Sequence, residues 1–378
     1  MAIDTSRTAE AELETIDINV NVGPQHPATH GVFRMILTVD GELVIDLDPV
    51  IGYMHRGNEK LPENCDYRQV IGYHDRTDYL AQFNTEHCYV EAVERLAGIQ
   101  PTERAEHIRV ILAEMNRLAS HLMFFGAFGT DIGLFGTSFM YAFRDRETIQ
   151  DFFEEITGER MMYNYFRPGG IAWDVPEDFN ARCAQVLGSV KRGLEDLDGL
   201  LMGNEIVLAR CRGLSTVSPE DAINWGLSGP MLRATGLKHD IRRAEPYSIY
   251  DRFEFDIPTG TQGDVYDRMI VRLEEMHQSV RIIEQALAAL PEGPIMAEGL
   301  KRVLRVPTGE VYMRVESPRG EYGVYIVAQG SDKPWRHKVR GASFSNLSAL
   351  RSMSVGHYVS DVIIILGSID IVLCEVDR

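Results

Sequence analysis

The chain lacks the sequence features of a membrane-spanning protein and of a nucleic-acid-binding protein. No run of about 18 or more apolar residues occurs, so we expect no transmembrane helix. Basic residues are in the minority, with 38 Lys and Arg against 56 Asp and Glu, and the formal net charge is −18. This negative charge argues against binding of nucleic acid or anionic lipid, because both require a basic surface.

Cysteine is scarce and scattered. The five cysteines include no C-x-x-C pair, and the nearest two, Cys65 and Cys88, are 23 positions apart. Neither an iron–sulfur cluster nor a thiolate zinc site is therefore indicated in this chain. We expect the cysteines to be free thiols, most of them buried.

The first residues lack both the basic segment and the apolar segment of a secretory leader. Residues 1–18 contain five acidic side chains and few apolar ones, which is typical of a mobile acidic arm. The rest of the chain contains no repeat and no linker that would divide it. We therefore predict an arm over 1–18, one domain over 19–378, and a cytoplasmic location.

The pattern of apolar residues predicts a mainly helical α+β fold. Helical spacing predicts long helices over 75–97, 101–125, 139–156, 179–202 and 265–290. Alternation around the Asp40-Gly41 turn predicts a hairpin over 32–50. Further strands are predicted over 310–315 and 323–328, and one or two over 362–372, where β-branched residues are concentrated. The expected architecture is a helical bundle with small β elements near both ends of the chain.

The most unusual segment is 21–31, with the sequence Asn-Val-Gly-Pro-Gln-His-Pro-Ala-Thr-His-Gly. Pro24 and Pro27 fix φ and lack a backbone N–H, which excludes ordinary helix and central strand. His26 and His30 then lie on a stiff loop, which suggests proton chemistry or ligand binding; solvated histidines in a tight turn are the alternative. A metal site on one helix face is disfavoured by Pro27 and by the absence of H-E-x-x-H.

Other polar residues stand next to apolar segments. Tyr79 lies at the expected start of a helix, and its ordinary interpretation is a core tyrosine. Asp131 lies at the glycine-rich end of the following helix, where it either caps a turn or needs a partner if it is buried. Arg56, Arg76 and His121 would ordinarily form structural salt bridges.

Seven segments together resemble the D subunits of bacterial NADH–quinone oxidoreductase (respiratory complex I), and they occur in the family's order over roughly residues 19–378. The segments are Gly23–Gly31, His55–Lys60, Asp75–Tyr79, Arg117–His121, Tyr141–Glu147, Arg167–Gly170 and Val376–Arg378. The family is related to the large subunit of nickel–iron hydrogenases, so the resemblance implies a hydrogenase large-subunit-like helical bundle.

Hydrogenase large subunits hold their metals with two pairs of cysteines. The resemblance equates these positions with Asp78 and Ala81, and with Val372 and Glu375; none is cysteine here. Cys374 is adjacent to one position but alone, so a thiolate-bound nickel–iron centre cannot be built. We therefore expect no metal in this chain, and a cavity that is free for another use.

In the family this cavity receives the headgroup of a quinone. The resemblance implies that Tyr79 and His30 each donate a hydrogen bond to a quinone carbonyl, and that Asp131 orients His30 and favours its protonated form. It also implies that Arg56, Arg76 and His121 lie near an iron–sulfur cluster of a neighbouring subunit. Quinone would be the substrate, this chain would bind no cofactor alone, and the iron–sulfur clusters and FMN would lie on other subunits.

The implied partners are the terminal-cluster subunit, the C subunit and the membrane subunit that forms the quinone entrance. The chain would sit peripherally on the cytoplasmic side of the membrane, in a complex that couples quinone reduction to proton translocation.

A non-catalytic scaffold subunit is the alternative, and the missing cysteines disfavour a membrane-bound hydrogenase. The segment Gly133–Ser138 lacks a proline usual in the family, so the shape of the pocket and the identity of the quinone stay open. The region 297–307 is also shorter than in relatives.

Overall fold

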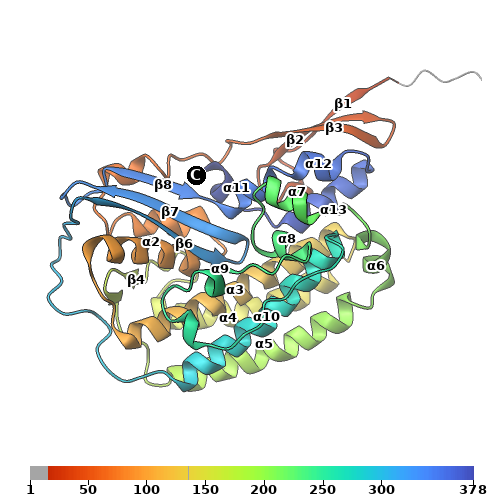
Figure 1. Cartoon of the computed structure of the whole chain (residues 1–378). Helices are drawn as coiled ribbons and strands as arrows, with labels where there is room; N and C mark the ends of the chain where they lie inside the picture. The colour runs from red at the N-terminus through yellow and green to blue at the C-terminus, as the bar shows by residue number, and fades with distance from the viewer. Residues whose placement is uncertain (1–15, 135) are drawn as a thin grey trace, which may run out of the picture.

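Four long helices form the body of the molecule. In the computed structural model, which describes residues 16–134 and 136–378, these are α3 (Glu103–Asp131), α4 (Thr137–Thr157), α5 (Phe179–Leu201) and α10 (Val265–Ala288). They lie side by side as a bundle, with α3 in contact with α4 and α10, and α5 in contact with α4 and α10 (Figure 1). The predicted α+β, mainly helical fold is confirmed.

Shorter elements surround this bundle. The other helices are α1 (Ile71–Thr77), α2 (Gln82–Ala97), α6 (Glu205–Cys211), α7 (Pro219–Asn224), α8 (Gly229–Ala234), α9 (Ile241–Ala244), α11 (Ala342–Leu347), α12 (Leu350–Ser354), α13 (Val359–Ile369) and α14 (Leu373–Asp377). Short 3₁₀ turns are η1 (Pro27–Thr29), η2 (Leu61–Asn64) and η3 (Tyr250–Arg252). The strands are β1 (Ile18–Val22), β2 (Arg34–Asp40), β3 (Leu43–Val50), β4 (Phe166–Arg167), β5 (Gly170–Ile171), β6 (Gly309–Ser317), β7 (Gly320–Ala328) and β8 (Arg336–Arg340).

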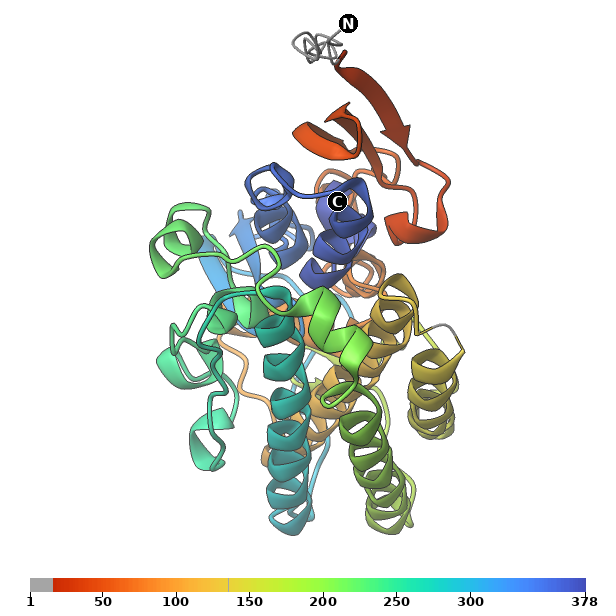
Figure 2. The same cartoon turned by 90° about the vertical axis from the view of Figure 1, so that its right-hand side faces the viewer.

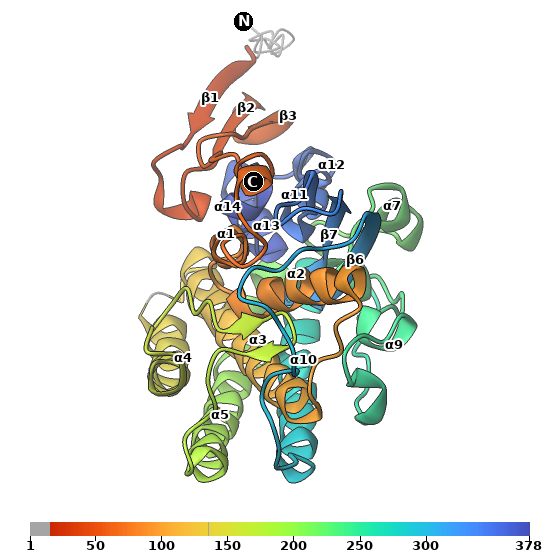
Figure 3. The same ribbon diagram turned by 90° about the vertical axis from the view of Figure 1, so that its left-hand side faces the viewer.

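The strands form small antiparallel sheets near the two ends of the chain, as predicted. The sheet β1–β2–β3 stands at the opposite end of the molecule from the free ends of the long helices (Figures 2 and 3). The hairpin β2–β3 turns at Asp40-Gly41, with Asp40 paired to Leu43. The second sheet has the order β6–β7–β8, so β6 and β8 are its edge strands, and α2 packs against β6 and β7.

Two separate apolar cores hold these parts together. The larger core lies among α2, α3, α4, α5, α10 and the sheet β6–β7–β8, and includes Phe83, Phe125 and Met269. The smaller core lies between the N-terminal sheet and the C-terminal helices, and includes Leu37 and Ile365. Among the described residues, no helix is both long enough and apolar enough to cross a membrane.

Two predictions of local structure were wrong. The predicted strands over 362–372 are the helix α13, in which the buried side chains of Val362, Ile365, Leu366 and Ile369 recur every three or four residues. Packing of this apolar stripe outweighs the weak β preference of branched side chains. The helix predicted over 75–97 is broken at 78–81, so Tyr79 lies in the break rather than at a helix start.

Most of the predicted acidic arm lies outside the described residues, and Ile18, assigned to that arm, is the first residue of β1. The helices α4, α5 and α10 agree within two residues with the predicted ranges, whereas α3 continues six residues beyond its predicted end at 125. Gly98 ends α2 in the left-handed conformation (φ 65°), directly after the predicted end at 97, and α3 begins just after Pro101, the first residue of the next predicted helix.

A network of buried charges joins α3 and α10 to the surrounding elements. The carboxylate of Glu275 on α10 lies 3.4 Å from Arg117 Nη1 on α3, and 3.2 Å from both Arg233 Nη2 on α8 and Arg242 Nη2 on α9. All four side chains are fully buried. Burial alone would raise the pKa of Glu275, but the arginines, led by Arg233, hold it well below its usual range. The charge is therefore kept inside the protein by its partners.

We predict that Glu275→Gln lowers the free energy of unfolding by about 3–5 kcal/mol, because it leaves buried guanidinium groups without their anion. Denaturant unfolding at neutral pH measures this. Since the folded pKa of Glu275 is depressed, its contribution is present above the unfolded pKa and is lost as pH falls through the folded value. The matched control is Glu284→Gln, which breaks only the surface pair with Lys191 and should change stability little. Equal effects of the two substitutions would contradict the structural role of Glu275.

A second prediction concerns two glycines. At Gly170 in β5, an added Cβ would lie 1.9 Å from the backbone oxygen of Ile295, so Gly170→Ala forces backbone apart and should cost about 1–3 kcal/mol. At Gly199, an exposed position inside α5, no atom lies within 4 Å, and Gly199→Ala should stabilise the chain by about 0.5–1 kcal/mol. Thermal unfolding of both variants measures these opposite signs.

Candidate functional site

A cavity of about 400 Å³ lies where the N-terminal loop, the break between α1 and α2, the end of α3 and the α13–α14 connection meet. His30, Tyr79 and Asp131 all line it. The three residues are 49 and 52 positions apart in sequence, so the fold brings together the residues that the resemblance singled out. Apolar side chains complete the wall, among them Leu80, Phe124, Phe139 and Ile371.

The loop 23–31 gives its two histidines different tasks. The ring of exposed His26 accepts a hydrogen bond at Nδ1 from Ala28 N (3.2 Å) and so caps η1. Thr29 Oγ1 donates to the carbonyl of His26 (2.7 Å), which tightens the same turn. His30 ends the turn in the left-handed conformation, φ 49°, and lines the cavity. Only His30 is therefore available for chemistry there.

His30 is paired with Asp131. His30 Nε2 lies 2.7 Å from Oδ2 of Asp131, the last residue of α3. Gly367 of α13 fits against this pair, because a Cβ there would lie 2.6 Å from the same Asp131 oxygen. Burial disfavours the imidazolium, but the hydrogen bond and charge of Asp131, with the charge of Asp370, outweigh it and raise the pKa of His30. The pair therefore holds a proton at the cavity wall.

Tyr79 reaches the cavity because the helix is interrupted beside it. Asp78 ends α1 with φ −120° and ψ 89°, and the side-chain amide of Gln82 donates to the carbonyl of Tyr79, fixing the break. Burial raises the pKa of Tyr79, and the neighbouring Cys374 adds to this effect. Its phenol therefore keeps its proton at neutral pH and can donate it.

Behind Tyr79, a guanidinium takes the central place among buried carboxylates. Arg319 Nη1 lies 3.2 and 2.9 Å from the two oxygens of Asp78, and Nη2 lies 3.5 Å from Asp370 Oδ1. Glu375 is also close, and burial together with the charge of Asp78 raises its pKa to about 7. Two positions equated with hydrogenase cysteines, Asp78 and Glu375, thus surround a cation. Within the described residues, no three His, Cys, Asp or Glu side chains are grouped as metal ligands.

Of the three residues expected near a partner's cluster, two are exposed and one is buried. Arg56 Nη2 donates to the carbonyl of Arg76 (3.3 Å), and both arginines are exposed, so they share one surface. His121 is fully buried on α3, where its Nε2 lies 3.1 Å from Glu275 Oε2, and burial lowers its pKa. Among the described residues, no hydrogen bond or salt bridge joins His121 to the two arginines.

Several residues of the cavity were not anticipated from the sequence. Asp370 was not singled out in the sequence, yet it lines the cavity and contacts Arg319. Its left-handed conformation, φ 60°, ends α13 and turns Ile371 into the cavity wall. Phe139, which follows the segment Gly133–Ser138, also lines the cavity.

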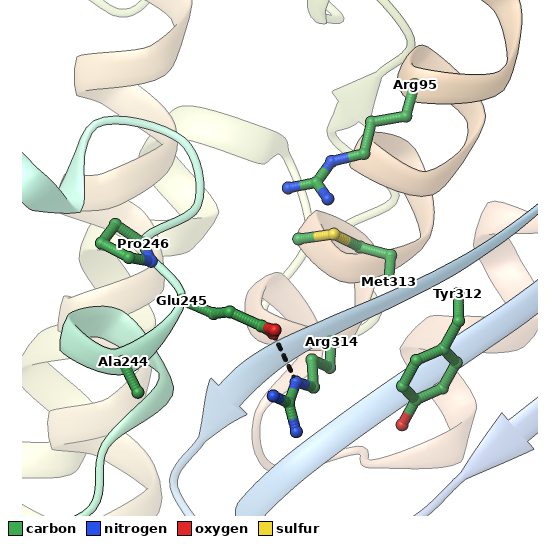
Figure 4. Close-up of a pocket in the computed structure, with 7 residues that line it drawn as sticks. All are labelled: Arg95, Ala244, Glu245, Pro246, Tyr312, Met313 and Arg314. Atoms are coloured by element: carbon green, nitrogen blue, oxygen red, sulfur yellow. Dashed lines mark hydrogen bonds and ion pairs between the residues drawn. The ribbon is translucent and has the colours of Figure 1, made fainter.

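A larger hollow, of about 700 Å³, lies between α2, α9 and β6 (Figure 4). Its cations are already neutralised, since Arg314 is paired with Glu245 and Glu321, and Arg95 with Glu91. None of the residues predicted for chemistry lines it. The cavity around His30 is therefore the candidate functional site.

Comparisons with known proteins identify the family of the chain. The family of the respiratory-chain NADH dehydrogenase 49-kDa subunit matches residues 131–305 and 300–378. The D subunit of NADH-quinone oxidoreductase from Carboxydothermus hydrogenoformans is 51% identical over 365 residues, which is 97% of this chain and 100% of the relative. The D subunit from Dehalococcoides mccartyi is 52% identical over 366 residues, and that from Clostridium beijerinckii 45% over 369, each covering nearly all of both chains.

Matches of this length and identity establish the family. The chain therefore belongs to the 49-kDa subunit family of respiratory-chain NADH dehydrogenase, and is a D subunit of an NADH–quinone oxidoreductase, complex I.

Proposed function

We propose that the cavity lined by His30, Tyr79 and Asp131 binds the headgroup of a quinone and is the place where the quinone is reduced to quinol. The observation that carries this proposal is the convergence of two proton donors, His30 and Tyr79, from distant segments onto one cavity, with Asp131 holding the His30 proton. Reduction of a quinone needs two electrons and two protons, with a donor at each carbonyl. The apolar side chains of the wall suit the faces of the ring.

Electrons would come from an iron–sulfur cluster of the neighbouring terminal-cluster subunit. The exposed arginines Arg56 and Arg76 supply a positive surface. Arg76 lies in the last turn of α1, just before the break between α1 and α2 that contains Tyr79. Positive charge next to a cluster raises its reduction potential. His121 is the third residue of this proposal; its buried Nε2 lies 3.1 Å from Glu275 Oε2.

Other parts of the assembly complete the proposal. The C subunit would pack on this chain, and a membrane subunit would provide the entrance for the quinone. In this arrangement the chain is peripheral, on the cytoplasmic side of the membrane. It holds no cofactor alone; FMN and the iron–sulfur clusters belong to other subunits.

Asp131 offers a link between reduction and proton translocation. When the quinone takes protons from Tyr79 and His30, Asp131 loses its cationic partner at 2.7 Å, and a buried negative charge is left. The changed charge would bias the position of the loop 23–31 relative to α3. The coupling therefore starts from a local electrostatic event.

The direct test is Tyr79→Phe in the intact complex in membranes. We expect normal assembly and a fall in quinone reductase activity of about 100-fold, because the phenolic proton donor is lost while the ring remains. The matched control is Tyr325→Phe, which removes only a surface hydrogen bond to Glu310 and should leave the activity unchanged. Full activity in assembled Tyr79→Phe complex would favour a non-catalytic scaffold subunit instead.

The second test is Asp131→Asn, which removes the anion beside His30 but keeps its shape. Since Asp131 raises the pKa of His30 and burial lowers it, the substitution should lower that pKa. The alkaline limb of quinone reduction should therefore move to lower pH, because His30 loses its proton earlier as pH rises. The yield of protons translocated per quinone reduced should also fall. An unchanged number of protons translocated per quinone would contradict the coupling role of Asp131. An unchanged alkaline limb of the pH profile would exclude His30 as the group that titrates.

A further inference from the structure

Three buried titratable side chains outside the cavity form a continuous chain of hydrogen bonds. His337 Nε2 on β8 lies 3.0 Å from His74 Nε2 on α1, and His74 Nδ1 lies 2.8 Å from the hydroxyl of Tyr322 on β7. All three side chains are at most 1% exposed. The sheet β6–β7–β8 and the helices α1 and α2 lie next to one another at this place (Figure 3).

These hydrogen bonds do not satisfy every buried polar atom of the three side chains. His337 Nδ1 is fully buried and has no hydrogen-bond partner among the described residues. A buried polar atom left in this way destabilises the fold, so its retention calls for an explanation. Burial lowers the pKa of His337 to about 4 and also lowers that of His74, so both rings are neutral at pH 7. A neutral imidazole has one N–H and one free acceptor, as a proton relay requires.

Aromatic and charged groups surround the two imidazoles. Tyr89 of α2 stacks on His74, with ring centroids 4.5 Å apart. The charged groups that act on His337 are Glu59 and Glu63 from the segment before α1, and its own neighbours on β8, Arg336 and Lys338. At 3.0 Å the two ring nitrogens are in hydrogen-bond contact, so the link between His74 and His337 is direct.

The inner end of the chain points toward the candidate site. The Tyr322 hydroxyl is close enough to Thr77, Glu375 and Asp78 for their side chains to act on its pKa. Asp78 in turn is bonded to Arg319, and Asp78 directly precedes Tyr79. The buried polar side chains therefore extend from His337 to the residues behind the cavity wall.

The outer end comes close to the surface. β8 is an edge strand of its sheet, and the residues on either side of His337, Arg336 and Lys338, are exposed. His337 itself is buried, and its exposed neighbours place this part of β8 at the rim of the sheet.

We propose that His337, His74 and Tyr322 form a proton-supply route that restores the proton of Tyr79 after quinone reduction, an inference that rests on the function proposed above. In one passage, His337 Nδ1 takes a proton from a hydronium ion, which leaves as water, and Nε2 releases its own proton to His74 Nε2. His74 Nδ1 then protonates the Tyr322 oxygen as Tyr322 passes its hydroxyl proton inward, through the carboxyl groups beside Arg319. One proton enters and one leaves, and no electrons move along the route.

The test compares His337→Gln, His74→Gln, Tyr322→Phe and the double variant His74→Gln/His337→Gln in intact complex in membranes, with the amount of assembled complex as a check. We expect each single variant to lower quinone reductase activity by about tenfold. Each should also raise the solvent deuterium isotope effect, because proton supply becomes rate-limiting. The double variant should be no worse than either single variant, since all act on one route.

The matched control is His87→Gln. His87 is also fully buried, has a pKa lowered to about 4 by burial, and has a ring nitrogen without a partner in the described part of the chain. It packs against Phe166 and Tyr247, and no hydrogen bond joins it to His74, His337 or Tyr322 in the described residues. It should leave the isotope effect unchanged. If His74→Gln does not assemble, His337→Gln and Tyr322→Phe still decide the matter.

The outcomes separate the two proposals. An unaltered isotope effect in assembled His337→Gln and Tyr322→Phe complexes, with activity lost in Tyr79→Phe, overturns the route and leaves the quinone site standing. Full activity in Tyr79→Phe overturns the quinone site itself. An isotope effect that rises equally in His87→Gln also overturns the route, because the effect would then follow from any buried histidine.

Discussion

The structure depends on the neutralisation of charge inside the helical bundle. Glu275 meets three arginines that come from α3, α8 and α9, and a second buried carboxylate, Glu114 of α3, contacts two of the same arginines. None of these ions is stable in a protein interior without its partners. The charged side chains of α3, α8, α9 and α10 can therefore be buried only together. The network thereby fixes the rotation of α3 about its axis, which packing of apolar side chains alone leaves less sharply defined.

The position of the candidate site follows from that constraint. α3 carries its ionic contacts in its middle and Asp131 at its end, so the orientation imposed at Arg117 and His121 is transmitted along a rigid helix to the cavity. The other wall is built by elements of opposite chain ends, the loop with His30 and the helix α13 with Gly367. Glycine at that point allows α13 to approach the His30–Asp131 pair closely. The chemistry of the cavity is thus supported from both of the apolar cores.

Much of the fold could be predicted because it is encoded locally. Apolar spacing located the long helices, and Gly98 and Pro101 marked their ends. The strands predicted at 362–372 failed because β-branched content is a weaker signal than the helical repeat that tertiary packing imposes on α13. Within the site, only resemblance to a family joined His30 to Asp131, since spacing in sequence says nothing about contacts across 101 positions. The pair His74 and His337, separated by 263 positions, and the cation Arg319 amid carboxylates gave no signal in a single sequence.

The division into two apolar cores has a mechanical consequence. His30 belongs to a loop whose η1 turn contacts α13, in the smaller core, whereas Asp131 ends a helix of the larger one. Their hydrogen bond of 2.7 Å crosses the boundary, and a slip of about 1 Å between the two halves would stretch it beyond hydrogen-bond range. The protonation state of His30 and the relative position of the two halves of the molecule are therefore coupled through this one bond. Neither can change without affecting the other.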